Sequence, residues 1–250
     1  MSGFYVNRKG TLEYLTAPGL EGTAHCFSTR FGGVSEGSLA SLNLGVHRDD
    51  SPGNVLENYR ILGEAVGFDP KNTVFTRQLH TDIVERVGKR DCGRGLIVPV
   101  DHACDGLVTN EPDVVLTVFS ADCTPVLLYD PVARAVGAVH AGWRGTAAAI
   151  GPCISQCCFE TDADVPEAMW AAFGETANAA IRSVEKATGK KYYVNLKELN
   201  AIALRRVGVT AIDIACECTA CEPQRFWSHR RVGNERGSLA AMIMLRGDAL

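Results

Sequence analysis

The longest apolar runs of the chain lie at its centre, where they predict buried β-strands. DVVLTVF (113–119), PVLLYD (125–130) and ARAVGAVH (133–140) are rich in valine and leucine and carry few polar positions. A strand that is buried on both faces shows this nearly continuous apolar pattern, whereas a strand with one wet face alternates. We therefore expect the three runs to be interior strands of one sheet.

Helical periodicity is clearest at 55–66, where one face collects four apolar side chains, Leu56, Tyr59, Leu62 and Val66. Asn54 is a candidate N-cap, Glu57 stands at the capping-box distance, and Gly67 suits the C-terminal end. The pattern therefore predicts an amphipathic helix that packs one face on a core.

The C-terminal half predicts two more helical segments. One covers 164–187 with a break near Gly174, and the other covers 195–208, with Asn195 as its cap and Gly208 as its end. Short strands are expected within 11–31 and at 73–76, 83–87, 96–100, 210–216 and 236–245.

This mixture predicts an α+β fold, a single domain over 1–250 with layered mixed β-sheets and flanking helices. One connection is unusually short. About nine residues separate the run that ends at His140 from the next apolar segment, IGPCI, and a crossover to a parallel strand needs a dozen or more. Either that segment is not a parallel neighbour, or a helix that belongs between the two is missing from the sequence.

Composition and charge exclude two classes of partner. The net charge is -4, so no basic excess exists to neutralise nucleic-acid phosphates or to bind a membrane surface. No apolar run approaches the roughly 20 residues that span a bilayer, and residues 1–14 contain no apolar signal-peptide core. We expect a cytoplasmic protein that binds neither nucleic acid nor membrane and is a monomer or weak homo-oligomer.

Three residues with metal-binding side chains stand where predicted strands meet loops. His80 lies in RQLHTD, Cys123 in SADCTP and His140 in VHAGWRGT. Two imidazoles and one thiolate are zinc ligands, and three protein ligands leave a fourth position for water or substrate. Taken singly, His80 also suits a surface or capping role and Cys123 a buried structural thiol. A Cys123 nucleophile with His140 as its base is a further alternative.

The chain has 10 cysteines, which we expect to be thiols in a cytosolic protein. The segment CECTAC contains a C-x-x-C pair, Cys218 and Cys221. This pair suits a turn with buried thiols, a redox pair, or half of a structural zinc site whose other half comes from Cys153, Cys157 and Cys158.

Arginines are the candidates for binding a phosphate or carboxylate, because a guanidinium fork matches such anions. We place Arg144 first, since it follows His140 between two glycines, and Arg30 second; the others are Arg77, Arg230 and Arg231. Asp105, Asp122 and Glu160 are candidate proton carriers. The sequence contains no G-x-G-x-x-G or P-loop pattern.

Seven segments together resemble the laccase-domain family, also called multicopper polyphenol oxidase-like, whose bacterial members are described as purine nucleoside phosphorylases. The resemblance extends over about 24–245 and rests on FSTRFGGVSEGSLASLNLG (27–45), RQLHTDIV (77–84), DGLVTN (105–110), SADCTPVLLYDP (120–131), AVHAGWRGT (138–146), IGPCISQCCFE (150–160) and CTACEPQRFWSHRR (218–231).

The resemblance implies a zinc ion bound by His80, Cys123 and His140. It implies phosphorolysis of adenosine, inosine and S-methyl-5′-thioadenosine, and deamination of adenosine. The partners would be a small nucleoside and phosphate. Within these motifs we assign catalysis to the three ligands and Arg144, and substrate binding to Arg30, Asn43, Arg77 and Gln78.

Two departures from the family pattern stand out. The family normally carries a helix between the HAGWRG and IGP segments, and Gly237-Ser238 replaces its glycine-arginine pair. A coupled copper cluster would need many histidines in H-x-H pairs, whereas this chain has 6 histidines and no such pair. Copper, the stronger divalent binder, can still replace zinc in vitro. A copper-dependent polyphenol oxidase and a cysteine-nucleophile hydrolase of peptidoglycan precursors stay open as alternatives.

Overall fold

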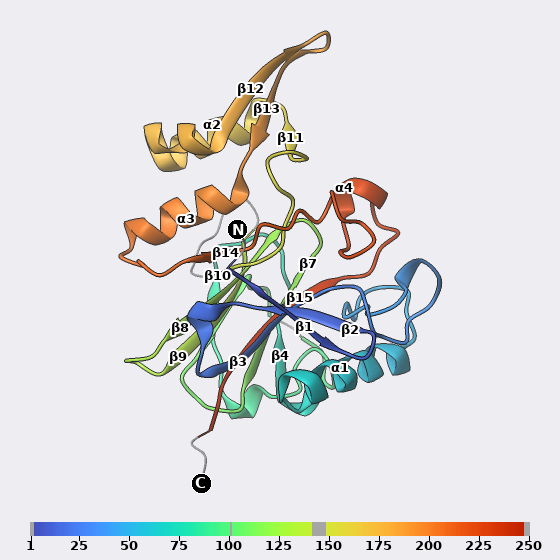
Figure 1. Cartoon of the computed structure of the whole chain (residues 1–250). Coiled ribbons are helices and arrows are strands. Elements are labelled where there is room, and N and C mark those ends of the chain that lie inside the picture. Colours follow the sequence, from blue (N-terminus) through green and yellow to red (C-terminus); the bar gives the residue numbers. More distant parts are fainter. Residues whose placement is uncertain (1–2, 101, 142–148, 248–250) are drawn as a thin grey trace.

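The computed structural model describes residues 3–100, 102–141 and 149–247. Two six-stranded sheets pack face to face, and a small three-stranded sheet projects beyond them beside α2 (Asp164–Phe173) (Figure 1). Both large sheets contain parallel and antiparallel neighbours. The predicted α+β fold of layered mixed sheets with flanking helices is confirmed.

The strand orders show how distant segments become neighbours. The first sheet runs β1 (Tyr5–Lys9), β2 (Leu12–Thr16), β3 (Thr23–Ser28), β15 (Leu239–Leu245), β7 (Val115–Ser120) and β4 (Thr73–Phe75). The second runs β14 (Asp213–Ile214), β10 (Ala149–Ile150), β8 (Thr124–Asp130), β9 (Ala135–Ala141), β6 (Gly106–Thr109) and β5 (Val84–Arg86). The small sheet runs β11 (Glu160–Thr161), β13 (Gly189–Val194) and β12 (Ile181–Lys186).

The main core fills the space between the two large sheets, where Leu116, Leu127 and Ile243 are fully buried. A second core lies on the outer face of the first sheet under α1 (Pro52–Val66), with the Tyr59 and Phe75 rings 5.3 Å apart. Because both faces of the first sheet are covered, its central strands carry apolar side chains at nearly every position.

Helix α1 begins earlier than predicted. Its N-cap is Ser51 and Pro52 stands in its first turn, where a missing N–H costs nothing, so Asn54 is not the cap. Gly67 ends the helix in the left-handed conformation (φ 94°), as predicted. Helix α3 (Leu196–Arg206) also follows the prediction, since the Asn195 side chain accepts a hydrogen bond from the Glu198 backbone N–H.

The prediction that the three central runs share one sheet is wrong. β7 belongs to the first sheet, whereas β8 and β9 are antiparallel neighbours in the second. The chain changes layers at Asp122, which has a φ of 94°. A strand in either of two facing sheets shows the same apolar sequence pattern as a strand inside a single sheet. The pattern therefore could not show whether the three runs share one sheet or lie in two.

Three further predicted elements differ from the structure. The segment 181–187 is not helical; residues 181–186 form β12, which pairs with β13 in a hairpin. Most β12 side chains are exposed, so the strand has no continuous apolar face packed on a core. The residues 96–100 form no strand; Ile97 and Val98 belong to a turn in which both N–H groups bind Gly93 C=O, and Val98 makes an isolated bridge with Arg94. Strand β14 is only two residues long, and 3₁₀ turns and the short helix α4 (His229–Val232) complete the described elements.

The short connection after β9 leads to a strand that is not a neighbour of β9. β10 pairs with β8 in an antiparallel manner and with β14 in a parallel manner, as the first of the two sequence alternatives required. The residues that join β9 to β10, 142–148, lie outside the described part of the chain.

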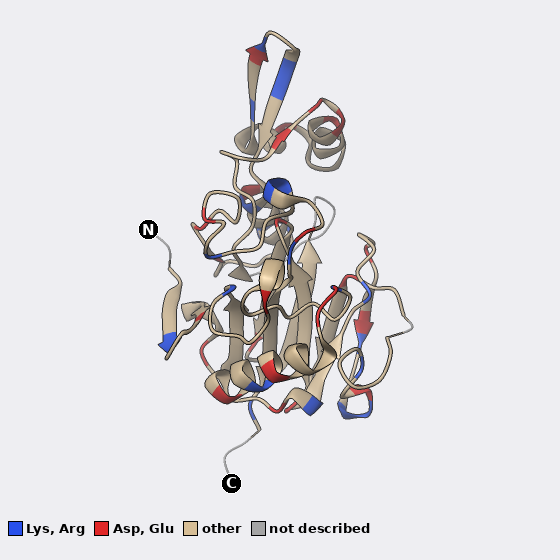
Figure 2. Ribbon diagram, turned by 90° about the vertical axis from the view of Figure 1, so that its right-hand side faces the viewer, with Lys and Arg blue, Asp and Glu red and all other residues tan. Residues whose placement is uncertain are grey.

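Acidic and basic residues are interspersed along the ribbon in Figure 2, mainly on helices, loops and the projecting hairpin, whereas the strands of the large sheets carry few of them. Among the described residues, no helix has the length and apolar character needed to cross a bilayer.

Candidate metal centre

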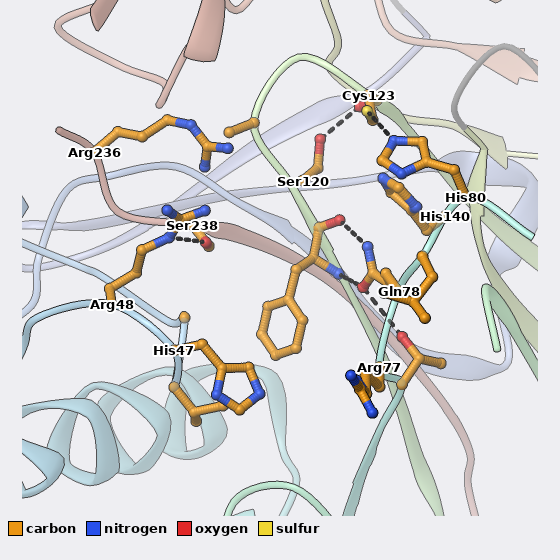
Figure 3. A pocket seen from close by; sticks show the side chains of 16 residues that line it. His47, Arg48, Arg77, Gln78, His80, Ser120, Cys123, His140, Arg236 and Ser238 are labelled. Atoms are coloured by element: carbon orange, nitrogen blue, oxygen red, sulfur yellow. Dashed lines mark hydrogen bonds between the residues drawn. The ribbon is translucent and has the colours of Figure 1, made fainter. Parts of the chain in front are cut away.

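The candidate centre lies in a cavity of about 560 Å³. Three segments supply its metal-binding side chains: His80 from the loop after β4, Cys123 from the turn between β7 and β8, and His140 from the end of β9. The sheet pairing explains their meeting, because β4 lies beside β7 and β8 lies beside β9. Figure 3 shows the three side chains together on one side of the cavity.

The three predicted ligands are close enough to share one ion. Their donor atoms all lie within 4.8 Å of one another, and His80 Nε2 is 3.5 Å from Cys123 Sγ. Zinc bonds of about 2.0–2.1 Å to nitrogen and 2.3 Å to sulfur place two tetrahedral ligands about 3.5 Å apart. The donor set and spacing therefore fit a zinc ion that keeps one position open.

The Asp105 carboxylate holds two of the three ligands in place through hydrogen bonds. Its carboxylate accepts hydrogen bonds from the backbone N–H groups of Leu79, His80 and Thr81 at 2.8–3.1 Å, and His140 Nδ1 lies 2.8 Å away. These bonds hold the loop in which His80 adopts a φ of 60°. Because an ionised carboxylate only accepts, His140 donates through Nδ1 and leaves Nε2 free to bind a metal.

The protonation of the site follows from these contacts. Burial acts to raise the pKa of Asp105, but the bonds from His140 and Thr81 hold it well below its usual range. Burial acts to lower the pKa of His140, and its bonds to Asp105 and Cys123 raise it to about 9. Burial acts to raise the pKa of Cys123, and its bonds with His140 and His80 lower it to about 6. Cys123 is therefore a thiolate near neutral pH.

A second carboxylate fixes the turn that carries Cys123. Asp122 is 9% exposed and accepts hydrogen bonds from Thr219 Oγ1 at 2.6 Å, Ser228 Oγ at 3.0 Å and the Arg230 backbone N–H at 2.6 Å. The segment 219–230, which lies 97 to 108 residues further along the chain, is thereby tied to the centre. Asp105 and Asp122 stand as positioning residues here, where the sequence indicated proton carriers.

The predicted substrate-binding residues separate into two groups. Arg77 and Gln78 line the cavity, although the Gln78 amide is engaged with both backbone groups of Phe119. Arg30 and Asn43 do not line it. The Arg30 guanidinium stacks on a tryptophan ring and binds two carbonyl groups, and the Asn43 side chain is fully buried. Arg144, the arginine placed first for phosphate, lies outside the described residues.

The sequence reasoning missed two arginines that the fold places in the cavity. Arg48 and Arg236 lie opposite the histidine–cysteine group (Figure 3), and Arg48 Nε donates to Ser238 Oγ at 3.3 Å. Burial and the neighbouring Arg48 charge lower the pKa of Arg236 to about 10, and its Nε has no hydrogen-bond partner among the described residues. Two cations facing one cavity favour an anionic ligand. The one sequence feature that pointed to this part of the cavity was Ser238, which stands where the family pattern has an arginine.

The family model described as multi-copper polyphenol oxidoreductase laccase matches residues 24–150 and 146–246. The two matches overlap at 146–150, within the short connection between HAGWRG and IGP. The purine nucleoside phosphorylase YlmD of Bacillus subtilis is 34% identical over 88% of this chain and 87% of its own length. The purine nucleoside phosphorylase YfiH of Escherichia coli is 33% identical over 91% and 96%. The crystal structure of YlmD from Geobacillus stearothermophilus is 32% identical, with a TM-score of 0.87 over 99% of this chain and 100% of that one.

Proposed function

The chain belongs to the multi-copper polyphenol oxidoreductase laccase family, and from that premise we propose that it is a zinc-dependent purine nucleoside phosphorylase. Its substrates are adenosine, inosine and S-methyl-5′-thioadenosine, and it also deaminates adenosine. The observation that carries the proposal is the cavity itself, in which Arg48 and Arg236 face the His80, Cys123 and His140 group.

The arginine side of the cavity suits inorganic phosphate. Arg236 and Arg48 both line the cavity with partly buried guanidinium groups, and the Arg236 Nε–H has no hydrogen-bond partner within the described part of the chain. A phosphate bound there forms charge-assisted hydrogen bonds and relieves the repulsion between the two cations. The phosphate oxygen then attacks C1′ of the ribose, and the broken C1′–N9 bond leaves its electron pair on the purine.

The remaining walls suit the nucleoside. Val46, Leu79 and Phe119 supply apolar surface, and the Phe119 ring is held edge-on against Phe75 at 5.1 Å. A cavity of this size that combines apolar surface with convergent polar groups is typical of small-molecule sites. We place the purine against the Phe119 ring and the ribose between this wall and the arginines.

The donor set also suits the chemistry at the purine. When bound, zinc would act as a Lewis acid on a substrate atom or on a water directed at purine C6. The role of the chain is to hold that position: Asp105 fixes the tautomer of His140 and the loop of His80, and Asp122 fixes the turn of Cys123. Both reactions would then take place in one cavity: phosphorolysis at C1′ of the ribose, beside the arginines, and deamination at C6 of the purine, beside the metal group.

The cavity offers little to the copper-oxidase alternative. Its lining contains one histidine beyond the metal group, His47. His25 is buried, with one ring nitrogen accepting from the Ala17 N–H at 2.9 Å and the other 3.0 Å from Thr23 Oγ1. A coupled copper cluster would need several more imidazoles beside the first group.

The lowered pKa of Cys123 favours one second candidate, a thiol nucleophile with His140 as its partner. Alkylation separates the two readings. In the zinc enzyme, bound metal protects Cys123 from iodoacetamide, and its removal by a chelator exposes the thiolate. Rapid labelling of Cys123 in metal-loaded protein, with loss of nucleoside turnover, would favour the nucleophile.

The decisive experiment couples elemental analysis to a nucleoside assay with and without phosphate. We expect zinc in protein purified without added metal, and ribose 1-phosphate as a product only when phosphate is present. Arg48→Ala and Arg236→Ala should each raise the KM for phosphate about tenfold or more, since a hydrogen bond to a charged group contributes about 1.5–3 kcal/mol. The exposed Arg90→Ala is the matched control. Free ribose formed at the same rate without phosphate would refute the assignment.

A further inference from the structure

Four cysteines outside the cavity form a second group of potential metal ligands. Cys157 and Cys158 come from the loop between β10 and β11, and Cys218 and Cys221 come from the loop after β14. In Figure 1 these loops lie between the second large sheet and the small sheet. They are joined at backbone level, because Cys153 and Cys218 form an isolated parallel bridge and Thr219 N–H binds Cys153 C=O at 3.1 Å.

The spacing of the four sulfurs matches a single tetrahedral ion. All four lie within 4.8 Å of one another, and four of the pairs are 3.4–3.8 Å apart. A zinc–sulfur bond of about 2.3 Å puts the corners of its tetrahedron about 3.8 Å apart. A disulfide would need about 2.05 Å. An iron–sulfur cluster with several irons would separate the sulfurs further, because they would bind different metal atoms.

The surroundings support a bound thiolate cluster. The Ser155 N–H donates to Cys218 Sγ at 3.3 Å, which is the kind of contact that orients a ligating sulfur. Lys197 is 6% exposed, and its ammonium group binds Ser155 Oγ at 3.1 Å and Glu217 C=O at 2.6 Å, next to both cysteine pairs. A zinc ion with four thiolates carries a formal charge of about −2, and this buried cation offsets part of it.

We propose that Cys157, Cys158, Cys218 and Cys221 bind one zinc ion in a closed, structural site that is separate from the catalytic centre. Four protein ligands leave no position for substrate, so the ion does no chemistry on the nucleoside. Cys153, which sequence reasoning included among the candidates, stays outside the group, since its thiol contacts the Ile154 carbonyl group.

The ion would join two parts of the fold. Cys158 and Cys218 belong to the small core beneath the three-stranded sheet, which also contains Met169 and Val194. Thr219, between the ligands of the second pair, binds Asp122 at 2.6 Å beside the catalytic Cys123. The zinc clamp therefore stabilises the small sheet and holds the segment that positions the catalytic turn.

Elemental analysis of the purified chain tests the site directly. We expect two zinc ions per chain, one for each ligand group. His80→Ala, which removes a ligand of the catalytic group, should retain one zinc ion. X-ray absorption on that variant should show only sulfur neighbours at about 2.3 Å.

Cysteine variants give the complementary result. Cys221→Ser should lose one zinc ion and lower the melting temperature while the catalytic zinc remains. Cys216→Ser is the matched control, because Cys216 is an exposed cysteine in the same loop that lies outside the group. It should keep both ions.

Three outcomes overturn the proposal. One is a single zinc ion in the wild-type chain that Cys221→Ser retains. Another is iron with acid-labile sulfide, and the third is an intact mass that shows a disulfide among the four cysteines. If Cys221→Ser fails to fold, the absorption spectrum of His80→Ala decides the question, and nitrogen neighbours there reject the four-sulfur site.

Discussion

Replacing Asp105 with asparagine tests whether its carboxylate positions the ligands of the candidate metal centre or only fills space there. The substitution keeps the size of a residue that is 2% exposed and whose side chain accepts five hydrogen bonds. Asparagine has one oxygen, and we expect it to stay on the Leu79 and Thr81 donors, which hold one carboxylate oxygen. Its NH₂ group would then face His80 N–H and His140 Nδ1, so His140 would have to accept through Nδ1 and carry its proton on Nε2. That tautomer cannot bind zinc through Nε2.

The size of the effect follows from these contacts. Two hydrogen bonds to a charged group are lost, at about 1.5–3 kcal/mol each, so the variant should be less stable by about 3 kcal/mol or more. For a chain of this length that lowers the melting temperature by about 6–12 °C. Loss of an orienting partner of a ligand should weaken zinc binding about 10–100-fold.

The assay is a chelator competition for zinc together with thermal unfolding of the metal-free protein. Asp82→Asn, an exposed neighbour in the same loop, is the control and should change neither quantity. If Asp105→Asn binds zinc as tightly as the wild type, Asp105 does not set the tautomer of His140. In that case the three ligands are not prepared for zinc by this carboxylate.

Three other predictions follow from single contacts. Zinc binding should release about one proton between pH 7 and 8. In this range His140, with its pKa raised to about 9, is protonated and must lose its proton to bind the metal, whereas Cys123, with its pKa lowered to about 6, is already a thiolate. Zinc affinity should therefore rise about tenfold per pH unit up to pH 9, which calorimetry in buffers of different ionisation enthalpy would check; no proton release would contradict the assigned states. Arg30→Ala should lower stability and leave the KM for nucleoside unchanged, since its guanidinium binds backbone carbonyl groups rather than the cavity; a raised KM with a normal melting temperature would restore its predicted substrate role. Asn195→Ala should cost about 1 kcal/mol of unfolding free energy by removing the cap of α3, measured by urea denaturation, and an unchanged midpoint would reject the capping role.

Local sequence signals predicted those parts of the protein that depend on local physics. Tyr59, Leu62 and Gly67 located α1, and Asn195 located α3, because helix faces and caps involve residues a few positions apart. Leu56 of the predicted stripe is exposed, and Val55 is buried in its place. The marked segments around His80, Cys123 and His140 likewise identified the metal-binding residue types, since unusual polar residues at strand ends carry their own signal.

The sequence by itself therefore determined the class of fold, two of the helices and the three candidate ligands. Only the tertiary structure decided which sheet each central strand joins, that Arg48 and Arg236 lie in the cavity opposite the histidine–cysteine group, and that four cysteines from two loops converge. The physical reason for the first is that buried strands of two facing sheets have the same apolar sequence pattern. The reason for the others is that sheet pairing between segments far apart in the chain brings an arginine or cysteine to its partners. Nothing in the immediate neighbourhood of such a residue records those partners.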